Sequence, residues 1–232
     1  MTFFNTLVTA TEAEQNYLLS APVITDALQG IISLPLYQAF LQQAYHHVKY
    51  TTPLLMRAGS GISHDQEWLR KALIEYINEE YGHEQWILND LVCTGVDAQF
   101  VRDSQPHPST AAMVAVVHGN IELLHPTAFF GMAHVLEGTS VKLASQAAGV
   151  IQQQLGLPKQ AFSYLNSHGA LDIEHVQFFA ELMDEITDPV AQNAIIATAK
   201  QVYVLYGDMF RALPKLALQF ARPAKLKDVA NG

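Results

Sequence analysis

The sequence predicts an all-α protein. Apolar residues recur at helical spacing along the whole chain, and no run alternates polar and apolar residues as a half-buried strand does. No hairpin dipeptide stands between two such runs. The chain has 232 residues and neither an internal repeat nor a low-complexity linker. We therefore expect one helical domain, residues 1–232, of about seven or eight helices.

Capping and turn residues set the expected bounds of the helices in the first half of the chain. A capping box, Thr11-x-x-Glu14, begins the first helix, and Gly30 ends the second. Pro35 fits the first turn of a long third helix, and Asp65 caps a fourth. These helices are expected at residues 11–19, 23–29, 35–56 and 65–92.

The second half follows the same rules. Pro126 begins a long helix, and Gly169 either kinks one helix or separates two. Asp188-Pro189 begins the last helix, which we expect to end before Pro214 because proline interrupts a helix. These helices are expected at residues 110–124, 126–154, 159–167, 170–186 and 188–212, and the polar tail from about residue 222 is expected to fray.

Composition excludes several classes of partner. The net charge is −9 and no basic cluster is present, which argues against binding to nucleic acid or to an anionic membrane. No apolar run approaches the ~18 residues of a membrane span, and residues 1–5 lack the features of a signal peptide. Cys93 is the only cysteine, so no internal disulfide can form, and we expect it to be a small buried or capping residue. These observations predict a cytoplasmic protein.

The most informative motif lies near residue 170. His168, Asp172 and His175 stand at i, i+4 and i+7, which places all three on one face of a helix. A helix N-terminus favours an aspartate and would account for Asp172 alone, but it would not account for His175. Two imidazoles and one carboxylate on one face form half of a metal site.

A second motif is Glu80-x-x-His83. These two residues share a partly apolar stripe with Tyr76, by three- and four-residue spacing. Burying even a neutral polar group without a partner costs about 2–7 kcal/mol, and a bound cation would offset that cost. Glu80 is thus a candidate metal ligand and catalytic residue. Tyr76, one turn earlier, is a hydrogen-bond donor to the site, a radical site or a core tyrosine.

Two further candidates are single residues. Glu137 is the one charged residue on an otherwise apolar stripe of the helix at 126–154, where it is either a metal ligand or a salt-bridged residue at the edge of the core. His47 is placed inward on the helix at 35–56, more so than His46, and is either a core histidine or a metal ligand or its hydrogen-bond partner.

Carboxylates and imidazoles without thiolates suit iron or manganese, and also zinc. Carboxylates on different helices can hold two metal ions close together. The ferritin-like bundle does this with two lone Glu residues and two Glu-x-x-His motifs. This chain instead has one Glu-x-x-His motif, one lone Glu and one His-x3-Asp-x2-His motif.

That three-part pattern resembles the ligand pattern of the haem-oxygenase-like di-iron oxidases and oxygenases, in the superfamily of TenA-like (thiaminase II) and PqqC-like proteins. The resemblance extends from the helix at Pro35 to about residue 213. It implies a haem-oxygenase-like (TenA-like) helical bundle around a central pocket, and commonly a homodimer. It also implies that dioxygen and two iron ions, or manganese, oxidise a small amine-, amino-acid- or fatty-acid-type substrate. The implied ligands are His47 (or His46), Glu80, His83, Glu137, His168, Asp172 and His175.

Related activities are less well matched. Thiaminase II requires a cysteine on the helix at 126–154, and haem oxygenase requires a histidine on the first helix; both are missing here. A metal-free PqqC-like oxidase or a small-molecule binding protein stays open as an alternative. Tyr203, Tyr206 and Phe210 on the last helix serve either the core or a dimer interface.

Overall fold

The computed structural model describes residues 2–221, except for the side chains of residues 141, 142, 145 and 168–176. Within this part the chain forms twelve α-helices and four short 3₁₀ segments and no strand, so the predicted all-α class is confirmed, although seven or eight helices was too few. The helices are α1 (Phe3–Ala10), α2 (Glu12–Leu19), α3 (Pro22–Leu28), α4 (Leu34–Val48), α5 (Thr51–Gly61), α6 (Glu67–Glu80), α7 (His83–Cys93), α8 (Ala98–Asp103), α9 (Pro108–Leu123), α10 (Phe129–Leu155), α11 (Ser163–Glu185) and α12 (Pro189–Leu216).

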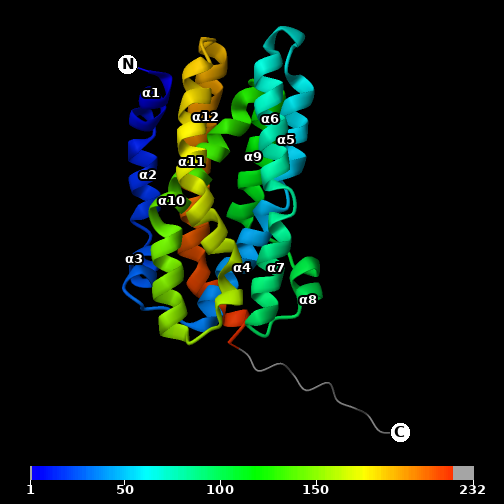
Figure 1. Ribbon diagram of the computed structural model, residues 1–232. Helices are drawn as coiled ribbons and strands as arrows, with labels where there is room; N and C mark the ends of the chain where they lie inside the picture. Colours follow the sequence, from blue (N-terminus) through cyan, green and yellow to red (C-terminus); the bar gives the residue numbers. More distant parts are fainter. Residues whose placement is uncertain (1, 222–232) are drawn as a thin grey trace, which may run out of the picture.

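The helices form an elongated bundle (Figure 1). α1, α2 and α3 follow one another along one side, and α5 to α8 lie on the opposite side. α10 makes extensive contacts with both α11 and α12, and α12 also packs on α2 and α9. No helix in the described residues is both long and apolar enough to cross a membrane.

Two of the expected long helices are each split in two. Gly82 adopts a left-handed conformation, φ +90°, which ends the helix predicted at 65–92 after Glu80 and starts α7 at His83. The helix predicted at 35–56 breaks at Lys49 and Tyr50. That break places Pro53 in the first turn of α5, where its missing N–H costs no helical hydrogen bond.

Other predicted boundaries also need correction. α1 and α8 were not predicted, and the capping box is wrong: Thr11 makes no side-chain cap and instead donates its hydroxyl to the Leu7 carbonyl oxygen at 2.8 Å. α12 continues past Pro214 to Leu216, because a proline in the last turn removes only one terminal hydrogen bond. α11 runs through Gly169 as one helix, after a 3₁₀ turn at Lys159–Phe162.

The core consists of two apolar clusters. The larger one joins α1, α3, α5, α6 and α9 to α12 and the start of α10. The smaller one joins α4 and α7 to the end of α10 and the start of α11. Phe40 packs against both clusters.

The backbones of α10 and α12 approach closely at Gly131. A Cβ added to Gly131 would lie 2.5 Å from the Ile195 carbonyl oxygen and 2.7 Å from the Ala199 nitrogen. Only glycine fits there, so this residue fixes how closely the two helices pack.

The start of α11 is held by α7. The fully buried carboxylate of Asp90 accepts hydrogen bonds from the Ser163 nitrogen (3.0 Å), the Tyr164 nitrogen (2.9 Å) and the Ser163 hydroxyl. The two backbone donors are otherwise unpaired N–H groups of the first helical turn. Burial raises the pKa of Asp90, while the three hydrogen bonds act in the opposite direction. Asp90 thus anchors the helix that carries the His168 motif.

Candidate functional site

A cavity of about 150 Å³ lies between the two apolar clusters. It is lined by residues of α3, α4, α5, α6, α10, α11 and α12, and this lining is mostly apolar. Among the described residues no lysine, arginine or histidine lines it. The polar side chains that do line it are Tyr37, Thr51, Tyr76, Glu80, Glu137, Thr139, Ser140, Tyr164 and Tyr206.

One end of this cavity carries its acidic residues. We call Tyr76, Glu80 and Glu137 the carboxylate end; the first two come from α6 and the third from α10. Burial, and then the nearby charges led by Glu137, raise the pKa of Tyr76 well above its usual value. The phenol therefore stays protonated and can act as a proton or hydrogen-bond donor beside a carboxylate.

Glu80 and His83 meet across the junction of α6 and α7. Glu80 is the last residue of α6 and His83 the first of α7, and the Glu80 Oε2 and His83 Nδ1 atoms are 3.2 Å apart. The His83 ring is buried and stacks on Trp86, with ring centroids 4.0 Å apart. The sequence predicted this proximity from spacing within one helix, whereas a helix–Gly82–helix turn produces it.

The two histidines of α4 point to different surroundings. His47 is fully buried and meets the edge of the Tyr206 ring, with ring centroids 5.6 Å apart, and Tyr206 lines the cavity. His46 lies elsewhere: its Nε2 atom is 2.8 Å from the Ser104 hydroxyl, and the Lys49 ammonium lies 3.4 Å from its Nδ1 atom. Burial, helped by the lysine charge, lowers the pKa of His46 to about 4. His47 is therefore the histidine next to the cavity wall.

The third motif lies on α11. His168, Asp172 and His175 fall within Ser163–Glu185, but their side chains are outside the described residues. Among the side chains that are described, no three of His, Cys, Asp or Glu come together as a metal-binding group. The structure thus brings Tyr76, Glu80 and Glu137 to one cavity wall and joins His83 to Glu80, without describing the α11 half.

The donor chemistry at the carboxylate end fits iron. Carboxylate oxygens and an imidazole are available, and no thiolate competes, because the only cysteine lies elsewhere. Cys93 is the last residue of α7 and is exposed, so of the two expectations, a buried or a capping residue, the buried one is wrong.

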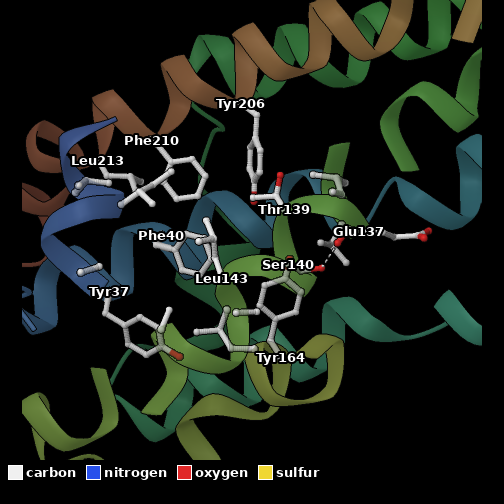
Figure 2. Close-up of a pocket in the computed structure, with 18 of the residues that line it drawn as sticks. Tyr37, Phe40, Glu137, Thr139, Ser140, Leu143, Tyr164, Tyr206, Phe210 and Leu213 are labelled. Atoms are coloured by element: carbon white, nitrogen blue, oxygen red, sulfur yellow. Dashed lines mark hydrogen bonds between the residues drawn. The ribbon is translucent and has the colours of Figure 1, made fainter. Parts of the chain in front are cut away.

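The opposite end of the cavity was not recognised in the sequence. Tyr37 and Phe40 of α4 and Phe210 and Leu213 of α12 form what we call the aromatic end (Figure 2). The Phe40 and Phe210 rings stack, with centroids 5.9 Å apart and 22° between their planes. The signal was present in the aromatic spacing of the last helix. It could not distinguish a core from an interface, and the structure places Tyr206 and Phe210 at the cavity and Tyr203 in the core.

Comparison with known proteins places this geometry in a family context. The family model described as iron-containing redox enzyme matches residues 38–207. A domain of unknown function with a haem-oxygenase-like fold, from Shewanella denitrificans, is 21% identical, covers 94% of both chains and has a TM-score of 0.81. A search of functionally curated proteins gave no significant match.

Two further solved structures have the same fold at lower identity. A TenA homologue from P. horikoshii is 10% identical, covers 93% of this chain and 100% of that one, and has a TM-score of 0.76. Haem oxygenase-2 from Synechocystis, in complex with haem and NO, is 14% identical, covers 95% of this chain and 88% of that one, and has a TM-score of 0.73. The haem-oxygenase-like, TenA-like fold predicted from the sequence is therefore confirmed.

Proposed function

The chain belongs to the haem-oxygenase-like family of iron-containing redox enzymes, and on that premise we propose that it is a non-haem, di-iron oxidase or oxygenase. It would act on a small organic substrate with dioxygen. The observation that carries the proposal is the carboxylate end: two glutamates and a tyrosine from two helices on the wall of an otherwise apolar cavity.

The ligand set would come from four helices. Glu80 and His83 at the α6–α7 junction and Glu137 of α10 would hold one side, and His168, Asp172 and His175 of α11 the other, with His47 of α4 completing the set. Two iron ions, or manganese, would fit this composition. When bound, the metal supplies dioxygen activation and electron transfer, while the protein sets the geometry and excludes water.

The remaining groups have roles that follow from their positions. Tyr76 would donate a hydrogen bond or a proton at the Glu137 carboxylate, because burial keeps its phenol protonated. The apolar lining would keep bulk water away from the reacting atoms, which strengthens electrostatic interactions at the carboxylate end.

Two activities of the structural neighbours receive less support. Neither α1 nor α2 contains a histidine that could serve as the axial ligand of a haem. α10 contains no cysteine, so the nucleophile expected for thiamine hydrolysis is missing. A metal-free oxidase or small-molecule binding protein is the second candidate, and the mostly apolar cavity favours it over any hydrolase.

Metal analysis tests the proposal. The protein, reconstituted anaerobically with ferrous iron, should bind about two iron ions per chain, and the ferrous form should consume dioxygen. His175→Ala should lower the iron content strongly, whereas His118→Ala, at an exposed histidine of α9, should leave it unchanged.

Iron content below a few tenths of an equivalent after reconstitution would overturn the di-iron proposal and favour the metal-free candidate. A sizing column run on the same samples would test the homodimer that the family resemblance implies.

A further inference from the structure

The cavity is divided by polarity along its length. Figure 2 shows Glu137 at one side and Tyr37, Phe40, Phe210 and Leu213 at the other, with Tyr206 between them. The aromatic end is closed by ring contacts: Phe40 stacks on Phe210, and the Tyr206 ring meets Phe210 edge to face, with centroids 4.9 Å apart. A ligand that fills this space must therefore be apolar at the far end and polar only near the glutamates.

The charges at the wall set a second limit. Both charged side chains among the described lining residues, Glu80 and Glu137, belong to the carboxylate end. At the aromatic end the Tyr37 hydroxyl is already used, because it donates to the Ala161 carbonyl oxygen at 2.7 Å. A charged group placed there would be buried without a partner, which carries a large free-energy penalty.

Tyr206 supplies a polar group that no described residue pairs with. Its side chain is only 6% exposed and lines the cavity, and its ring contacts are to His47 and Phe210. Its hydroxyl makes no hydrogen bond to any described residue, and in Figure 2 it projects toward the middle of the cavity. A buried hydroxyl is normally hydrogen-bonded, so a bound molecule is the natural partner.

We propose that the cavity binds a compact apolar molecule with a single polar head, oriented with the head between Tyr206 and the glutamates and the body against Phe40 and Phe210. That such a molecule is the substrate rests on the proposed oxidase function, whereas its binding to the cavity does not. The proposal excludes substrates that are charged at both ends.

The volume limits the size of the body. An apolar cavity of about 150 Å³ in another protein takes up a molecule the size of benzene, and the cavity here has the same volume, about 150 Å³. The body should therefore be a phenyl group or an alkyl chain of about six carbons. Longer chains would require the aromatic end to open.

Binding to the metal-free protein tests this separately from metal loading. We would treat the protein with EDTA and titrate it calorimetrically with n-alkylamines of four to twelve carbons and with 1,6-diaminohexane. Affinity should rise about fourfold for each methylene until the cavity is full and then fall. Hexylamine should bind at least tenfold more tightly than 1,6-diaminohexane, which differs only in a second charge at the far end.

Two variants locate the ends of the ligand. Tyr206→Phe should weaken hexylamine binding about threefold to tenfold by removing one hydrogen bond, whereas Tyr50→Phe, at an exposed tyrosine, should not change it. Phe210→Ala should move the optimum to longer amines, and Phe210→Leu would serve if the alanine variant does not fold.

Equal affinity for the monoamine and the diamine, or no dependence on chain length, would overturn the proposal. An unchanged affinity in Tyr206→Phe would remove that hydroxyl from the site. Because iron content is measured on separate samples, failure of either experiment leaves the other interpretable.

Discussion

The two ends of the cavity are built in different ways. The carboxylate end uses polar side chains of α6 and α10, beside the point where Gly82 separates α6 from α7. The aromatic end uses stacked rings from within two unbroken helices, α4 and α12. Apolar stacking stabilises the fold directly, whereas buried polar groups without a ligand oppose it. One cavity therefore contains two different regions. The carboxylate end is suited to chemistry, and the aromatic end is suited to selecting a ligand by its shape.

The largest expected effect is a loss of stability that disturbs both ends of the cavity, because it acts on the contact of α10 with α12. Gly131→Ala would place a methyl group against the backbone at Ile195 and Ala199, and should lower the free energy of unfolding by about 3 kcal/mol. Gly149→Ala on the same helix, where nothing lies within 4 Å, should stabilise the protein by about 0.5–1 kcal/mol. Urea unfolding measures both, and equal effects would contradict the close packing at Gly131.

The next effect is confined to the carboxylate end. Glu137→Gln should weaken iron binding by about 100-fold or more, because the neutral amide is a poor ligand. The metal-free variant should unfold at the same urea concentration as the metal-free wild type or a higher one, since a half-buried charge is removed. Glu75→Gln, at an exposed position of α6, is the control. Unchanged iron affinity in Glu137→Gln would remove this residue from the ligand set.

A smaller effect concerns the wall between the two ends. Asp90→Ala should cost about 2 kcal/mol, because it leaves the first N–H groups of α11 unpaired near Tyr164, which lines the cavity. Asp97→Ala removes an exposed cap of α8 and should cost about half as much. Urea unfolding measures both losses. Equal losses would show that the burial of Asp90 does not increase the free energy that its cap contributes.

The smallest expected effect is on the pH dependence of stability, and it comes from His46, which lies outside both ends of the cavity. The pKa of His46 is about 4 in the folded protein and about 6.5 when unfolded. Between these values the unfolded chain binds a proton that the folded chain does not, so stability is full above pH 6.5 and falls as the pH drops toward 4.

His46→Asn should therefore reduce the loss of stability between pH 7 and pH 5 by about 1.8 kcal/mol. The comparison is made by urea unfolding of both proteins at the two pH values. An identical pH dependence in the variant would show that His46 does not contribute.

The sequence predicted the fold class and the position of most polar candidates, because periodicity and Pro or Gly signals are local. Pro35, Asp188 and Gly30 behave at helix boundaries as expected, whereas Pro126 begins a short 3₁₀ segment and α10 starts only at Phe129. Gly82 was missed because a single glycine within a strong apolar period is compatible with either a continuous helix or a break.

The candidate site was harder to predict. Glu80, Glu137 and Tyr76 could be chosen because polar residues on apolar stripes are rare. The aromatic end could not, because aromatic residues at helical spacing look the same whether they fill a core or border a cavity. Only the packing of α4 against α12 distinguishes these cases.

The cap supplied by Asp90 also bears on how the chain folds. Asp90 and the residue it caps are 73 positions apart, so the start of α11 is stabilised by a contact that closes a long loop, and closing such loops is slow. We therefore expect α11 to complete its first turn only after α7 has docked. The helix with the histidine-rich motif would then be among the last to form, and metal could bind there only to a bundle that has already assembled.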